Sequence, residues 1–253
     1  MRKGTLHIVV AVCTLIGWTP RAEASGVNLR WDACLADGGT ANRSFACDLN
    51  SGAVTLVPSF VLGTPLPRVS RVTSTLQLAS ASPVLPEWWN VNTCRIGAIV
   101  AASPLNVLSF NCVDWTNLQG NAGVTGFVVG ERGSNTARLE VAGQIGFGTG
   151  TGSADLDGTT EYLTSPLRIS IIKSTGANAC SGCSVGMCIV LGRIEVASRT
   201  LPTVVLSQAA SGPGGNFVTW QGGAGVSVGA AVGCPAATPA REHTWGAVKA
   251  LYR

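Results

Sequence analysis

The cysteines limit what this chain can fold into more than any other feature. Of nine cysteines in 253 residues, Cys13 lies in a segment with the features of a removable export signal. The other eight are Cys34, Cys47, Cys94, Cys112, Cys180, Cys183, Cys188 and Cys234. An even number of cysteines in an exported chain is typical of disulfide bonds. The sequence therefore predicts a domain that is cross-linked by disulfides.

The first 24 residues have the pattern of a secretory signal peptide. Arg2 and Lys3 give a positive start, residues 6–17 are mostly apolar, and residues 22–24 (Ala-Glu-Ala) match the small-x-small cleavage pattern. A buried N-terminal helix is the alternative, but Pro20 and the small residues fit a signal better. We therefore expect cleavage after residue 24, a secreted or cell-surface protein, and a single domain over residues 25–253.

Eight cysteines allow 105 pairings, and sequence alone does not choose among them. Proximity favours Cys34–Cys47 and Cys94–Cys112, which leaves Cys180, Cys183, Cys188 and Cys234 to share two bonds. The Cys180-Ser-Gly-Cys183 segment could also be a redox motif or half of a zinc site. No βαβ pattern or second C-x-x-C accompanies it, so structural disulfides are the preferred interpretation.

The chain between the cysteines has the pattern of short strands and glycine-rich turns. Val72, Ser74, Leu76 and Leu78 alternate with polar residues, as on a half-buried strand. Further strands are expected at residues 54–62, 95–102, 124–129, 137–147, 162–172, 188–197, 203–207 and 216–220. Such a series predicts an all-β fold, specifically an antiparallel β-sandwich of jelly-roll type.

One short helix is expected at the C-terminal end. Thr244 can cap a segment in which Trp245, Val248 and Leu251 recur at helical spacing. The segment would pack as a terminal turn on the sandwich.

Composition excludes several classes of function. Only 12% of residues are charged, against about a quarter in an average soluble domain. Lys and Arg are too sparse to coat nucleic acid. No apolar run of about 18 residues would remain after processing, so no transmembrane helix is expected. Few charges guard the strand edges, which leaves self-association through an exposed edge strand as one possibility.

Several segments together resemble a group of uncharacterised exported bacterial proteins. The opening Val-Asn-Leu-Arg-Trp-Asp (residues 27–32), residues 44–48 and residues 82–89 carry this resemblance, with the Cys180–Leu191 and Phe217–Gly223 segments and Cys234-Pro235. The resemblance implies secretion, a bacterial source and a β-rich fold, and it assigns no site.

The sequence offers little for catalysis. A Ser-His-Asp arrangement needs a histidine, and after processing only His243 remains. A pair of carboxylates could hydrolyse glycosides. The acids that could form such a pair are Glu87, Asp114, Glu131, Glu140, Glu161 and Glu195. A secreted glycoside hydrolase is therefore the alternative hypothesis.

Asp155, Asp157 and Glu161 resemble part of a calcium loop. Oxygen ligands at alternate positions before Gly158 would suit Ca²⁺. On a full EF-hand template two ligand positions fall on Ser153 and Thr164, and an Asp-Gly hairpin turn explains the same residues. We therefore expect no cofactor, with calcium as a weak alternative.

Three tryptophans are the candidate ligand-binding residues. Trp88 and Trp89 are adjacent, so on an extended segment their side chains point to opposite faces, and one could be exposed. Trp115 could join that surface, and an exposed indole can stack on a sugar ring. The leading hypothesis is therefore a non-catalytic exported structural or binding protein of the cell surface or matrix, with carbohydrate binding through exposed tryptophan.

Overall fold

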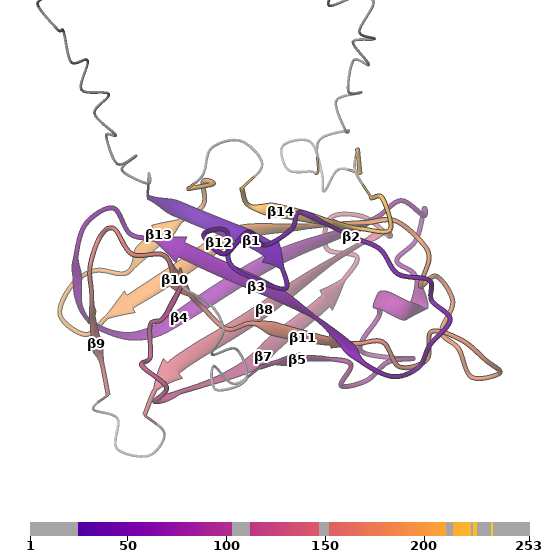
Figure 1. The fold of residues 1–253 in the computed structure, drawn as a ribbon, viewed down its shortest axis with the longest axis horizontal. Helices are drawn as coiled ribbons and strands as arrows, with labels where there is room; N and C mark the ends of the chain where they lie inside the picture. Colours follow the sequence, from indigo (N-terminus) through magenta and orange to yellow (C-terminus); the bar gives the residue numbers. More distant parts are fainter. Residues whose placement is uncertain are drawn as a thin grey trace, which may run out of the picture.

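The computed structural model describes residues 25–102, 112–146, 152–210, 215–223, 225–226 and 234. The chain is all-β, as expected, with two mixed sheets arranged in two layers (Figure 1). Within the described residues the only helical element is a three-residue 3₁₀ turn, η1 (Glu87–Trp89). None of these residues forms a helix long and apolar enough to cross a bilayer. The expected signal peptide and C-terminal helix lie outside the described residues.

The first layer is a six-stranded sheet in the order β5-β11-β3-β10-β6, with β1 also paired to β3. Its strands are β1 (Gly26–Trp31), β3 (Ala53–Val61), β5 (Ile99–Ala101), β6 (Val113–Asp114), β10 (Tyr162–Leu163) and β11 (Leu167–Ser170). β3 is the centre of this sheet, because β1, β10 and β11 all pair with it.

The second layer is an eight-stranded sheet in the order β2-β14-β12-β4-β8-β7. Its strands are β2 (Asn42–Arg43), β4 (Leu66–Ser80), β7 (Gly120–Val129), β8 (Thr136–Ile145), β9 (Ala154–Leu156), β12 (Met187–Ser198), β13 (Val204–Leu206) and β14 (Phe217–Trp220). β13 pairs with β12 and β9 pairs with β4, both off the main path. The long strands β4, β8 and β12 form the middle of this layer.

The expectation of purely antiparallel sheets is wrong. β6 pairs parallel with β10, and β2 pairs parallel with β14. Both β2 and β6 are two-residue strands in connecting segments. Such short pieces can join a sheet in either direction, because the loops around them set their path.

Alternation along β4 places its apolar side chains between the layers. Val72, Leu76 and Leu78 are buried in the main core, whereas Arg71 and Thr73 face outward. Leu29 and Phe60 of the first sheet belong to the same core. Successive side chains of a β-strand point to opposite faces, so the period-two pattern places the apolar face of β4 against the core.

Four disulfides cross-link the domain, as expected, but the predicted pairing is wrong. The bonds are Cys34–Cys112, Cys47–Cys183, Cys94–Cys180 and Cys188–Cys234, with Cα–Cα distances of 5.6–6.2 Å. Neither Cys34–Cys47 nor Cys94–Cys112 forms. The set of four C-terminal cysteines yields only Cys188–Cys234, because Cys180 and Cys183 bond to partners far away in the sequence. Since the two cysteines of the C-x-x-C segment bond to different partners, they do not form the redox bond that such a motif makes.

This connectivity gives a distinctive result in peptide mapping. Cys180 and Cys183 are only three positions apart, so most digests leave them on one peptide. Trypsin leaves Cys188 on that peptide as well, because no Lys or Arg lies between Lys173 and Arg193. We expect mass spectrometry of the non-reduced tryptic digest to find it joined to three others, which contain Cys47, Cys94 and Cys234. A peptide pair joined by Cys34–Cys47 would contradict the fold.

Candidate functional site

The predicted tryptophan platform does not form. Trp88 and Trp89 are fully buried, and Trp115 is 2% exposed. The two adjacent tryptophans lie in η1 rather than on an extended segment, so both can turn inward. The ring of Trp88 stacks on Trp220 at a centroid distance of 5.3 Å. The expectation that one of the pair is exposed is therefore wrong, and stacking of a sugar on these rings loses its physical basis.

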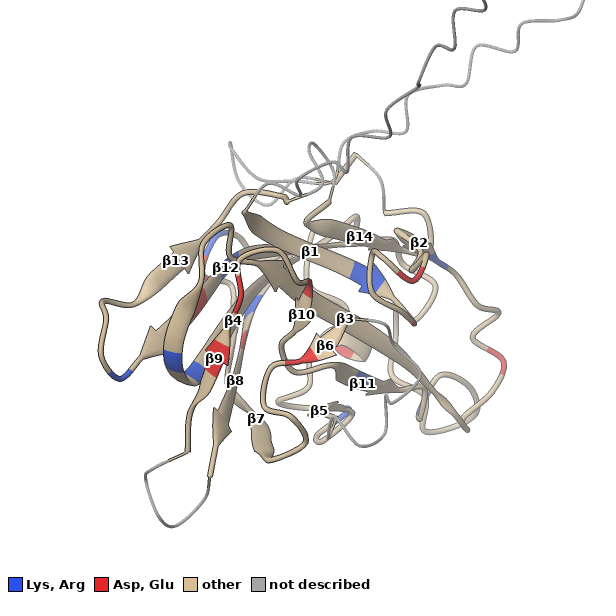
Figure 2. Ribbon diagram, turned by 60° about the vertical axis from the view of Figure 1, so that its left-hand side comes forward, with Lys and Arg blue, Asp and Glu red and all other residues tan. Residues whose placement is uncertain are grey.

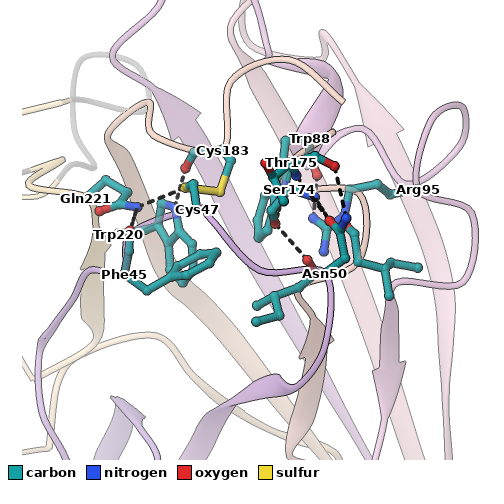
Figure 3. Close-up of a disulfide and its surroundings, with 12 residues drawn as sticks. Phe45, Cys47, Asn50, Trp88, Arg95, Ser174, Thr175, Cys183, Trp220 and Gln221 are labelled. Carbon is teal, nitrogen blue, oxygen red and sulfur yellow. Dashed lines mark hydrogen bonds between the residues drawn. A yellow bond between two sulfur atoms is a disulfide. The ribbon is translucent and has the colours of Figure 1, made fainter. Parts of the chain in front are cut away.

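A buried arginine holds Trp88 in place. The Arg95 guanidinium lies 3.4 Å from the centre of the Trp88 ring and donates hydrogen bonds to the carbonyls of Trp88, Ser170 and Ile172 (Figure 3). Burial lowers the pKa of Arg95 to about 10. Within the described residues no carboxylate pairs with this cation. The carbonyl oxygens and the indole face take the place of a counterion.

The same end of the molecule contains two of the disulfides. Cys47–Cys183 lies beside Trp220, whose Nε1 donates to the carbonyl of Cys183 at 2.9 Å (Figure 3). Trp88 Nε1 donates to Ser174 Oγ at 2.9 Å, and Asn50 Oδ1 accepts the Ser174 backbone N–H. Every polar group named here is used inside the protein. We therefore assign this cluster to the stability of the fold and not to ligand binding.

Replacing Arg95 by lysine tests this assignment. Lysine cannot reproduce the planar fork that reaches three carbonyls and the ring together. We expect Arg95→Lys to lower the free energy of unfolding by about 2–4 kcal/mol in urea denaturation. Arg168→Lys is the matched control on an exposed position, where a change within about 0.5 kcal/mol is expected. Equal effects of the two variants would contradict the structural role.

The three candidate calcium ligands each have a separate task. Asp155 Oδ1 accepts the backbone N–H of Arg68. Asp157 accepts from the Thr159 and Thr160 backbone and from the Tyr162 hydroxyl. Glu161 is buried and accepts from Asn28, Ser59 and the Ala36 N–H.

Their oxygens do not gather into a cation site. Within the described residues, the one group of acids and cysteines close enough to share a metal ion is Cys34, Asp37 and Cys112. Both of its sulfurs are joined in a disulfide. The alternative of an Asp-Gly turn accounts better for Asp157.

The hydrogen bonds around Asp157 hold its pKa well below the ordinary value of 3.8, with the Thr160 hydroxyl the largest cause and the Thr159 backbone next. A lowered pKa means that Asp157 stabilises the fold above about pH 4, and that this contribution is lost as the pH falls further.

We expect Asp157→Asn to lower the melting temperature at pH 7, because it removes charge-assisted hydrogen bonds worth about 1–2 kcal/mol. The difference between wild type and variant should shrink below pH 4. Differential scanning calorimetry from pH 2 to pH 7 measures this. A difference that stays constant across the range would contradict it.

The other acids that could form a catalytic pair also have partners. Glu87 accepts from Ser181, Glu131 and Glu140 pair with Arg138, and Glu195 pairs with Arg193. Asp114 accepts from the N–H groups of Thr116 and Leu118 and from the Thr116 hydroxyl. Each carboxylate thus has a role in the fold.

The bonds of Asp114 create a rigid turn. Asn117 and Leu118 both have a left-handed backbone, with φ of 49° and 64°. That conformation is tolerated by asparagine but costs leucine roughly 1–2 kcal/mol. Strained backbone of this kind is often found at functional sites. The turn follows Trp115 and leads directly into β7.

A pocket of about 390 Å³ opens beside this turn. We call it the Thr116 pocket; its lining residues are Thr116, Asn117, Gln119, Ile145, Gly152, Ser153 and Ala154. It lies at the opposite end of β8 from the tryptophan cluster, where the chain passes from the first sheet to the second. The lining combines amide and hydroxyl groups with the apolar side chains of Ile145 and Ala154, and none of the lining residues is ionisable.

Candidate residues from the sequence lie beside this pocket. Asp114 and Trp115 are two of them, and the lining begins at the next residue, Thr116. Trp115 lies in the core near Gly143, where an added Cβ would come within 3.7 Å of the indole. Asp-x-Thr-Asn is the kind of sequence that forms a side-chain-capped turn, and this was the available signal.

A smaller pocket of about 180 Å³ lies between the start of β1 in the first sheet and the end of β13 in the second. Ser25, Gly26, Val205, Leu206, Ser207 and Gln208 line it. Like the Thr116 pocket, it contains no carboxylate. Its volume is below the range of about 300–1,000 Å³ typical of small-molecule sites, which makes the Thr116 pocket the stronger candidate.

Comparisons with known proteins assign no family. No protein-family model matches the chain, and no curated protein matches it significantly.

Proposed function

We propose that this chain is an exported, non-catalytic binding protein of the cell surface or extracellular matrix, and that the Thr116 pocket holds one sugar ring of a glycan. The observation that supports this most is the uncharged lining of the pocket. A sugar presents hydroxyl groups on its rim and C–H groups on its faces. Amides and hydroxyls beside apolar side chains match both kinds of surface.

The rigid turn favours binding at this place. Asp114 fixes the backbone that carries Asn117 and Gln119, so little conformational entropy is lost when a ligand orders them. The four disulfides support an extracellular location, and so does the resemblance to exported bacterial proteins. We also propose that the two sheets form a sandwich with jelly-roll topology. β7 forms one edge of the second sheet, and we propose that self-association occurs through it.

The alternative of a glycoside hydrolase has less support. A hydrolase needs two carboxylates facing one sugar, about 5–10 Å apart. The lining of neither pocket contains an acid. The acids considered for this role accept hydrogen bonds or form ion pairs within the domain.

A glycan array with purified residues 25–253 tests the proposal. We expect binding to at least one glycan, and Gln119→Leu should abolish it because an amide that can bond a sugar hydroxyl is lost. Gln208→Leu, in the smaller pocket, is the matched control and should bind like wild type. Sugar release from the bound glycan, or binding that Gln119→Leu leaves intact, would overturn the proposal.

A further inference from the structure

Three exposed arginines meet at one end of the second sheet. The Arg199 N–H donates to the carbonyl of Arg68 at 2.9 Å, so β4 and the end of β12 bring these two residues together. Arg71 lies three residues further along β4, opposite Ala197. We call these residues the arginine patch. Figure 2 shows basic segments near β9, on the side of the molecule where β4 and the β12–β13 turn lie.

Among the described residues, no acid forms an ion pair with the arginine patch. Arg43, Arg138 and Arg193 have carboxylate partners. Across the described part of the chain, none of the three patch guanidinium groups has an ion pair or a side-chain hydrogen bond. Two acids lie nearby: Asp155, whose Oδ1 accepts the Arg68 backbone N–H at 2.8 Å, and Glu195, which lies opposite Thr73 and is already paired with Arg193. With Glu195 paired to Arg193, the three patch arginines and Asp155 leave an excess of positive charge.

The patch is next to the Thr116 pocket. Ala154 lines the pocket and pairs with Val69, so β9 lies between the pocket and the start of β4. On the other side, Gln144 pairs with Arg71, and the next residue, Ile145, lines the pocket. Ile145 is buried and Arg71 is exposed, so the pocket and Arg71 lie on opposite faces at this end of the sheet, and a ligand that contacts both passes around the end of β8. A chain molecule with one unit in the pocket would therefore reach the arginines with a neighbouring unit.

We propose that the ligand is an acidic polysaccharide, with one ring in the Thr116 pocket and the carboxylates or sulfates of adjacent units on the arginine patch. This deepens the proposed function and rests on it. A membrane surface is less well matched, because binding in the interface needs a broad apolar face. The nearby β12–β13 turn presents one large exposed apolar side chain, Leu201.

A comparison of an acidic polymer, polygalacturonate, with a neutral one, dextran, separates the contribution of the arginine patch from that of the Thr116 pocket. We expect residues 25–253 to bind polygalacturonate more tightly than dextran in isothermal titration calorimetry at low salt. The double variant Arg71→Gln/Arg199→Gln should weaken polygalacturonate binding by about tenfold, because two nearby charges are removed. Added salt should reduce the wild-type advantage, since it screens exposed charges.

Arg132→Gln/Arg168→Gln is the matched control, with the same loss of charge at two exposed positions away from the patch. It should keep the wild-type affinity. Equal weakening by both double variants would show a general effect of net charge and overturn the proposal. Exchange of Asp155 for asparagine, which can still accept from Arg68, should tighten binding because a repelling charge is lost.

The outcomes distinguish this inference from the proposed function. Glycan binding through Gln119 with no preference for the acidic polymer would overturn the inference alone. Arginine-dependent binding of polygalacturonate that Gln119→Leu leaves unchanged would overturn the role of the pocket. Vesicles of phosphatidylcholine with about one third phosphatidylglycerol test the membrane alternative. If the protein binds these vesicles and not the polymer, the patch binds membranes and the inference is overturned.

Discussion

The tryptophan core depends on two covalent links that meet in one short loop. Cys180 and Cys183 connect the loop between β11 and β12 to Cys94, after η1, and to Cys47, before β3. These connections are not local, because they span 86 and 136 residues of sequence. Closing such long loops removes many conformations from the unfolded chain, and the stabilisation is typically about 2–4 kcal/mol for each bond. Trp220 donates to the carbonyl of Cys183, and Trp88 and Trp89 pack against Trp220, so the links hold together the segments that bury these rings.

A buried polar group connects the outer face of the first sheet to the segment that follows β1. Glu161 accepts from Asn28 on β1, from Ser59 on β3 and from the Ala36 N–H. Desolvation lowers the pKa of nearby Arg30, and the charge of Glu161 opposes that shift. A buried carboxylate is costly unless it is hydrogen-bonded, and here three donors meet that need. Glu161 therefore fixes the register of β1 on β3 instead of acting on a ligand.

The sequence predicted most of the second sheet because local pattern determines it. Alternation identified the middle of β4, and the strands expected at residues 137–147 and 188–197 match β8 and β12 to within two residues at each end. The disulfide pairing could not be predicted, because it depends on which loops meet after the sheets have packed. Cys34 and Cys47 are close in sequence, but they pair with Cys112 and Cys183, which belong to other parts of the chain. The error over Trp88 has a similar cause, since alternation applies to extended chain and not to a 3₁₀ turn.

For a different reason, the sequence does not identify the Thr116 pocket. Its residues are ordinary polar and small residues, and no single one has distinctive chemistry. Their significance comes from their arrangement. Asp114 accepts the N–H of Leu118 in a turn that holds Leu118 in an unfavourable left-handed conformation. At the tryptophan end the rings are buried, and the Nε1 groups of Trp88 and Trp220 donate internal hydrogen bonds. The pocket end has exposed amides, and nearby arginines have no ion pair within the described residues. The Cys34–Cys112 disulfide lies two residues before Asp114, so the segment that leads to the pocket is also cross-linked. Such a domain is suited to present a fixed binding surface, because the disulfides limit the motion that would otherwise be lost on ligand binding.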